Sequence, residues 1–182
     1  AQKLASNLKQ DYNVIMTRSD DTFVPLGKRA EIGNDANADL FISIHLNAAS
    51  STSANGSEVF YFSKKESAYA AEVAKFENSV DKGYADVPLS DFIINDIFYR
   101  VNQQKSAMLA TDILDNIVNE FGLRKRGVFG ANFAVLRGSN SPSILVEIGF
   151  VTNSGDMSTY GTDSSRVKLA SEIAQGVRKH FE

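Results

Sequence analysis

Apolar residues occupy the even positions of residues 40–47, and polar or aromatic residues occupy the odd ones. This period of two is typical of a β-strand with two different faces. Short apolar runs predict four further strands. These are residues 13–18, 58–62, 133–137 and 143–150.

Apolar positions that recur every three or four residues predict helices between these strands. The expected helices are residues 1–10, 25–36, 64–79, 104–121 and 164–181. Strands that alternate with helices favour an α/β fold with a mainly parallel sheet. The length of 182 residues suits one domain, residues 1–182.

Residues 80–103 differ from their surroundings and are predicted to be a helical insertion within the domain. Asp86 is placed to cap a helix that has Pro88 in its first turn. The apolar stripe of this helix would be unusually broad, so either it packs on the core or it lies in a cleft. The stripe consists of Leu89, Phe92, Ile93, Ile94, Ile97, Phe98 and Val101.

His45 lies near the carboxyl end of its strand, where ligands gather in α/β folds. It is therefore a candidate metal ligand or acid–base group. The alternative is a core histidine that makes a single hydrogen bond. His180, the other of the two histidines, falls in the last turn of the terminal helix, where solvent or the helix dipole accounts for it.

Glu147 stands in the middle of an equally apolar strand. Burying an ionised carboxylate costs several kcal/mol or more unless something compensates for the charge. The compensation would be a metal, a raised pKa or an arginine, and the candidate arginines are Arg18, Arg29 and Arg137. A histidine and a glutamate on two separate apolar strands favour a metal-assisted hydrolase.

The composition narrows the function classes. The chain is 43% hydrophobic and 23% charged with a net charge of −3, which does not favour nucleic-acid binding. No apolar run approaches the ~20 residues that a membrane span needs. Cysteine is absent, which excludes thiolate metal sites, cysteine nucleophiles and disulfides, and is compatible with an exported bacterial protein. The chain opens in an expected helix, so any targeting segment would lie upstream.

Several motifs in order resemble those of one enzyme family, the zinc-dependent N-acetylmuramoyl-L-alanine amidases that bacteria use on peptidoglycan, in particular the cell-division type. The similarity covers nearly the whole chain, and residues 37–48 match almost letter for letter. The other matching segments are residues 16–21, 25–29, 56–61, 126–128, 135–137 and 145–153.

The resemblance implies a single mixed, mainly parallel sheet of about five to six strands flanked by helices, with one site on its rim. It implies hydrolysis of the amide between N-acetylmuramic acid and L-alanine. His45 would be a zinc ligand, and Glu147 would be the catalytic carboxylate that activates the zinc-bound water. The expected cofactor is Zn²⁺, the expected substrate is peptidoglycan, and the expected location is periplasmic or extracellular.

The family's first zinc histidine and a zinc glutamate lie upstream of its first helix, so we expect the chain to be N-terminally incomplete and to bind zinc weakly as it stands. Residues 80–103 resemble an added regulatory helix that plugs the zinc site until an activator protein displaces it. Asp86 or Asp91 would supply the acid of the plug.

Two other functions fit the same residues. A catalytically inactive cell-wall binding or regulatory module would keep the fold without the metal site. A different zinc hydrolase, such as a carboxypeptidase, would keep His45 and Glu147 but cut another bond. The products released from purified muropeptides distinguish the two hydrolases.

Overall fold

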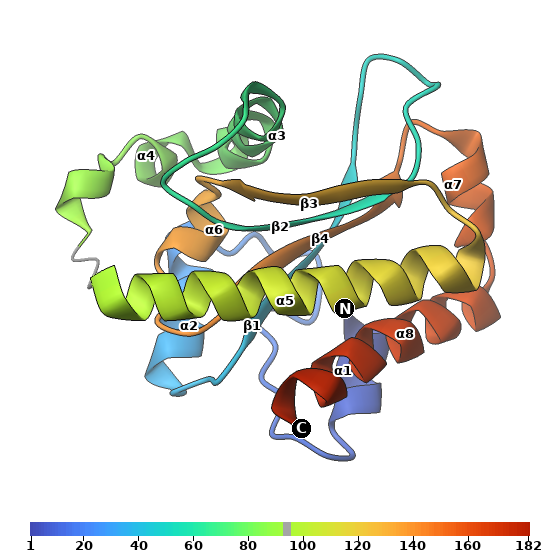
Figure 1. Ribbon diagram of the computed structural model, residues 1–182, viewed down its shortest axis with the longest axis horizontal. Coiled ribbons are helices and arrows are strands. Elements are labelled where there is room, and N and C mark those ends of the chain that lie inside the picture. The colour runs from blue at the N-terminus through green and yellow to red at the C-terminus, as the bar shows by residue number, and fades with distance from the viewer. Residues whose placement is uncertain (93–95) are drawn as a thin grey trace.

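The computed structural model describes residues 1–92 and 96–182, and a four-stranded sheet lies at its centre (Figure 1). The strand order is β1-β4-β2-β3. β1 runs parallel to β4 and β3 runs parallel to β2, whereas β2 and β4 are antiparallel. The sheet is therefore single and mixed, as expected, but it has four strands instead of five to six. The strands are β1 (Phe41–Asn47), β2 (Ser57–Phe62), β3 (Lys125–Ala131) and β4 (Ser143–Phe150).

Two expected strands are wrong. Residues 13–18 form no strand, and Val14 packs against the core without joining the sheet. Residues 133–137 turn into the short helix α6 (Ala134–Arg137), because the backbone N–H groups of Leu136 and Arg137 bond back to the carbonyl of Phe133. The strand that the sequence did not reveal is β3.

Helices precede, separate and follow the strands, and most lie where the sequence predicted them. The expected helix at 104–121 is longer than predicted and begins at Asp96. The helices other than α6 are α1 (Gln2–Leu8), α2 (Leu26–Asp35), α3 (Ala68–Asn78), α4 (Lys82–Ala85), α5 (Asp96–Phe121), α7 (Ser154–Thr159) and α8 (Asp163–Phe181). No helix within the described ranges combines the length and the apolar character needed to cross a bilayer.

Each face of the sheet is covered by its own set of helices (Figure 1). On one face, Val59 of β2 and Val146 of β4 pack against α1, α5 and α8. On the other, Phe60 of β2 and Leu145 of β4 pack against α2, α3 and α6. Consecutive strand residues thus serve opposite cores. The second face, beneath α3, is also the face of the polar residues described below.

The insertion is not the single helix that we expected from Asp86 to Val101. It consists of a 3₁₀ turn (Ser79–Asp81), the four-residue α4, a second 3₁₀ turn (Leu89–Asp91) and the start of α5. Ile93 and Ile94 of the expected stripe lie outside the described residues. Ile97 and Phe98 are exposed, so this part of the stripe is not packed on the core.

The segment between α3 and α5 is fastened to the domain by Arg137. Its guanidinium group donates to the carbonyls of Tyr84, Ala85 and Val87. The same group lies between the rings of Tyr84 and Phe92, about 5 Å from each ring centre. Residues 81–92 therefore form a strap that is held along its length by one buried arginine.

Candidate metal and catalytic site

Three side chains form a polar row across neighbouring strands. His45 of β1 stands opposite Glu147 of β4, and Glu147 stands opposite Glu58 of β2. Cross-strand partners share a face of the sheet, so the three side chains lie on the face covered by α3. Sheet register alone therefore brings His45 and Glu147 together, although 102 positions separate them in sequence.

Glu77, in the last turn of α3, completes the group from above the sheet. Its Oε2 lies 2.7 Å from Nδ1 of His45. One nitrogen or oxygen atom each from His45, Glu77 and Glu147 lies within 4.8 Å of the other two. Among the residues that the structure describes, this is the group of histidines and acids that is arranged to hold a metal ion.

The acid that approaches His45 is not one of the two that we expected. Asp86 follows α4 as its C-terminal cap, and Asp91 lies in a 3₁₀ turn, where it accepts a hydrogen bond from Ser90. Both belong to the strap, which contacts α2 through a hydrogen bond from Leu26 N–H to Asp81 and α6 through Arg137. Glu77 reaches the site because it is carried by the helix that packs directly on the sheet.

Glu147 is completely buried, and neither of its carboxylate oxygens has a hydrogen-bond partner in the described structure. Arg18, Arg29 and Arg137 all donate to backbone carbonyls instead of pairing with it. Burial, followed by the nearby charges of Glu77 and Glu58, raises the pKa of Glu147 to about 9. The raised pKa was one of the three expected forms of compensation.

The surroundings of His45 were partly predictable. The hydroxyl of Ser43 lies 2.9 Å from Nε2 of His45, on the strand face where alternation puts both residues. Asn47, the next residue on that face, contacts Glu58 instead. His180 is far along the chain on α8, where its ring makes an edge-on contact with Phe181 and burial lowers its pKa. It takes no part in the metal-binding group.

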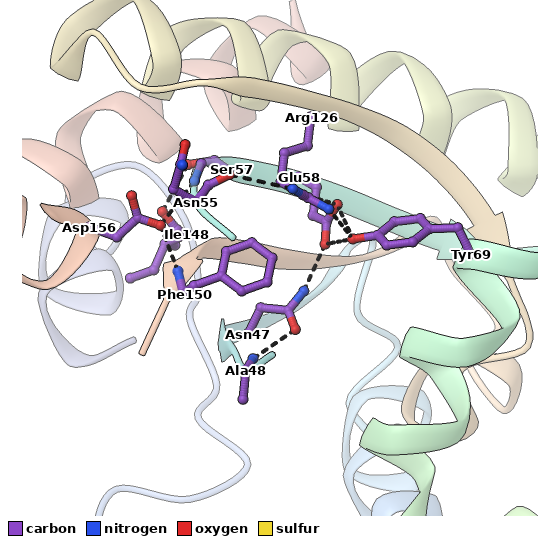
Figure 2. Close-up of polar contacts among 11 residues, drawn as sticks. Asn47, Ala48, Asn55, Ser57, Glu58, Tyr69, Arg126, Ile148, Phe150 and Asp156 are labelled. Atoms are coloured by element: carbon purple, nitrogen blue, oxygen red, sulfur yellow. Dashed lines mark hydrogen bonds and ion pairs between the residues drawn. The ribbon is translucent and has the colours of Figure 1, made fainter. Parts of the chain in front are cut away.

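Beside this group, the carboxylate of Glu58 is fully buried and fully hydrogen-bonded (Figure 2). It accepts from Asn47 Nδ2 at 2.7 Å, from Arg126 Nε at 2.9 Å and from the hydroxyl of Tyr69. Arg126 also donates from Nη2 to that hydroxyl at 2.8 Å. Glu58 and Glu147 are thus adjacent buried acids with opposite environments, one saturated with donors and one without any.

The unpartnered carboxylate is the observation that tests whether a metal fits. Buried polar groups are nearly always satisfied, so a glutamate with two unbonded oxygens calls for a partner that residues 1–92 and 96–182 do not supply. Imidazole nitrogen and carboxylate oxygen are donors that zinc accepts. The residues present are therefore compatible with a zinc ion beside Glu147, to which His45 could supply a nitrogen ligand and Glu77 an oxygen ligand.

Comparison with known proteins places this geometry in a family. Residues 1–179 match the family model described as N-acetylmuramoyl-L-alanine amidase. The amidase AmiC of Neisseria meningitidis is 37% identical over 93% of this chain, and AmiA of Escherichia coli K12 is 35% identical over 91%. The chain spans 42% and 60% of the lengths of these two relatives.

Solved structures agree with the sequence matches. The N-acetylmuramoyl-L-alanine amidase of Clostridium difficile 630 superposes with a TM-score of 0.73 at 30% identity, covering 99% of this chain and 78% of that one. An amidase of Nostoc punctiforme, AmiC2, gives a TM-score of 0.70 at 29% identity, with 99% and 79% covered. The mixed sheet and its flanking helices are the fold of these enzymes. The chain belongs to the N-acetylmuramoyl-L-alanine amidase family.

Proposed function

We propose that the protein hydrolyses the amide between N-acetylmuramic acid and L-alanine in peptidoglycan. The observation that carries the proposal is the buried Glu147 carboxylate, which has no hydrogen-bond partner among the described residues and lies beside His45 and Glu77. A buried carboxyl group beside a candidate metal site is suited to carry a proton during hydrolysis. The family membership supplies the substrate class and supports an exported protein that works outside the cytoplasm.

Zinc is the metal that we propose for the site, with His45 as a ligand. When bound, zinc would polarise the scissile carbonyl and lower the pKa of a water molecule. The hydroxyl of Ser43 contacts Nε2 of His45 and so fixes the orientation of the imidazole ring relative to Glu77 and Glu147. In the arrangement described here, Nδ1 of His45 is engaged by Glu77.

Glu147 would move the proton in both halves of the reaction. A zinc ion beside Glu147 would oppose the effect of burial on its pKa and favour the ionised form. In the first half the carboxylate would then take a proton from the attacking water, whose oxygen bonds to the lactyl carbonyl carbon. In the second half the carboxyl group returns that proton to the nitrogen of L-alanine as the carbon–nitrogen bond breaks. The products are a free lactyl carboxylate and a peptide with a free amine.

The position of Glu77 supports autoinhibition, in which a residue of the chain blocks its own site. It reaches His45 from the last turn of α3, immediately before the insertion at residues 80–103. We propose that this contact represents a closed state and that Glu77, in place of Asp86 or Asp91, is the acid that blocks the site. An activator protein that engages the insertion would withdraw α3 and open it.

The proposal is tested by replacing Glu147 with glutamine and measuring both zinc content and release of peptide from purified peptidoglycan. The variant is expected to retain its zinc, because His45, the proposed ligand, is unchanged. Its turnover is expected to fall at least a hundredfold, because the change removes the proton acceptor. Glu172→Gln is the matched control, because Glu172 is also buried but lies on α8, over the opposite face of the sheet.

Two outcomes contradict the assignment. If Glu147→Gln loses zinc as well as activity, Glu147 is a ligand and not the proton carrier. If the full-length protein, shown by metal analysis to hold zinc, releases no peptide even after Glu77→Gln removes the blocking acid, the protein is a binding module of the amidase fold. Mass spectrometry of the products identifies the bond that is cut.

A further inference from the structure

The buried carboxylate of Glu58 connects three elements that surround the site (Figure 2). Asn47 reaches it from the end of β1, two residues beyond His45. Tyr69 reaches it from the first turn of α3, and Arg126 reaches it from β3. Each contact is a hydrogen bond to an ionised acceptor inside the protein, which is the stronger class of hydrogen bond.

Tyr69 and Glu77 lie on the same side of α3. Their spacing of eight residues, with buried Val73 midway between them, puts all three on the helix face toward the sheet. The helix is thus anchored in its first turn to Glu58 and meets His45 with its last turn. Because a helix is stiff over this length, the anchor at one end sets the height of the other end above β1.

The remaining polar anchor of α3 points elsewhere. Asn78 donates to the carbonyl of Asn132 and accepts from the N–H of Ala134, so it ties the last turn to the start of α6. In the described structure, Tyr69 and Glu77 make the polar contacts of α3 with the row of side chains on β1 and β2.

We propose that Glu58 and Tyr69 are positioning residues: their hydrogen bonds hold α3 at the height where Glu77 meets His45. The inference deepens the proposed regulation of the site and rests on the role proposed there for Glu77. The Glu58 carboxylate acts as a common anchor for the strand that carries His45 and the helix that carries Glu77. Loosening the anchor at Tyr69 therefore weakens a contact two helical turns away.

The direct test uses the metal-free chain, Tyr69→Phe and imidazole NMR. The chain has two histidines, so His45 gives one set of ring signals and His180 provides an internal reference. Glu77→Gln defines the ring shifts of His45 without its carboxylate partner. The hydroxyl deletion is expected to move the His45 signals at least halfway toward those values and to leave His180 unchanged.

Amide hydrogen exchange measures the same opening from the side of the helix. Tyr69→Phe is expected to speed exchange in α3 by roughly tenfold, because losing a hydrogen bond to a charged group shifts an opening equilibrium by at least that factor. Exchange in α8 should not change. Tyr160→Phe is the matched control, since it removes a buried hydroxyl that bonds the carbonyl of Ile148 and does not touch Glu58.

A double variant decides whether Tyr69 acts through Glu77. If it does, Tyr69→Phe moves the His45 signals in the parent and adds nothing in the Glu77→Gln background. Unchanged His45 signals in the single variant, or an equal shift in both backgrounds, would overturn the inference. These readouts need neither zinc nor turnover, so they fail or succeed independently of the proposed hydrolysis.

Discussion

At the scale of single residues, the unusual feature is an acid that the fold keeps protonated. Its folded-state pKa of about 9 exceeds the ordinary value of 4.5, so between these values the folded chain binds a proton that the unfolded chain has lost. Stability contributed by the protonated group is therefore present below about pH 5 and is lost as the pH rises toward 9.

This sign predicts that Glu147→Gln stabilises the metal-free protein at neutral pH. The glutamine keeps the shape of the protonated acid and cannot ionise. We expect a gain on the order of 3 kcal/mol in the free energy of unfolding at pH 7 and almost none at pH 4. Urea denaturation of both proteins at several pH values measures it. A gain that is equal at both pH values would mean that ionisation of Glu147 is not the cause.

The sequence exposed only half of the residues at the site. His45 and Glu147 stood out because each is a rare polar residue inside an apolar strand. Glu77 and Glu58 did not stand out, because Glu77 is one of several charged residues in an alanine-rich helix and Glu58 begins a strand where a charge is unremarkable. Glu77 and Glu58 matter because they lie close to Glu147 in the folded chain. One sequence with 22 acidic residues does not reveal which acids lie close together. The roles of His45 and Glu147 as ligand and base stay predictions.

At the scale of elements, periodicity predicted β1 and most helices, whereas short apolar runs predicted β2 and β4 correctly and two other strands wrongly. β1, β2 and β4 were recognisable because buried strands carry uninterrupted apolar or alternating patterns. β3 has two glycines and begins with two basic residues, so its sequence lacks the apolar pattern of a strand. It is a strand because it pairs with β2. Residues 133–137 are apolar enough for a strand but have no neighbouring strand to pair with, and they turn into α6.

The strap gives a prediction at this scale. Arg137→Lys replaces a planar group with five donors by a point charge that cannot serve three carbonyls and lie between two rings. We expect at least a fivefold faster tryptic cleavage after Lys82, an exposed residue of the strap. Arg166→Lys, at an exposed position on α8, is the control. An unchanged cleavage rate would show that Arg137 does not hold the strap.

At the scale of the whole molecule, a close contact between α8 and α5 leaves no room for a side chain at one position. Gly176 of α8 packs against α5, and a Cβ atom there would lie 2.5 Å from Cγ1 of Ile113. Together with α1, the two helices cover one face of the sheet, so separating them disturbs the core beneath.

Gly176→Ala is therefore expected to destabilise the protein by about 1–3 kcal/mol, even though alanine is the better helix former. Ile113→Ala should relieve part of the clash in the double variant. Gly83→Ala is the control, since a Cβ there meets nothing within 4 Å. Thermal and urea denaturation give the comparison, and equal stability of Gly176→Ala and the parent would refute the steric argument.

Glu147 lies on an inner strand of the sheet, whereas Glu77 lies on a helix that packs over that sheet. Hydrogen-bonded strands flank Glu147 on both sides, so its position does not depend on α3. If α3 moves as proposed, substitutions in that helix would change access to Glu147 and leave its chemistry intact. Regulation and catalysis would then be separable by mutation.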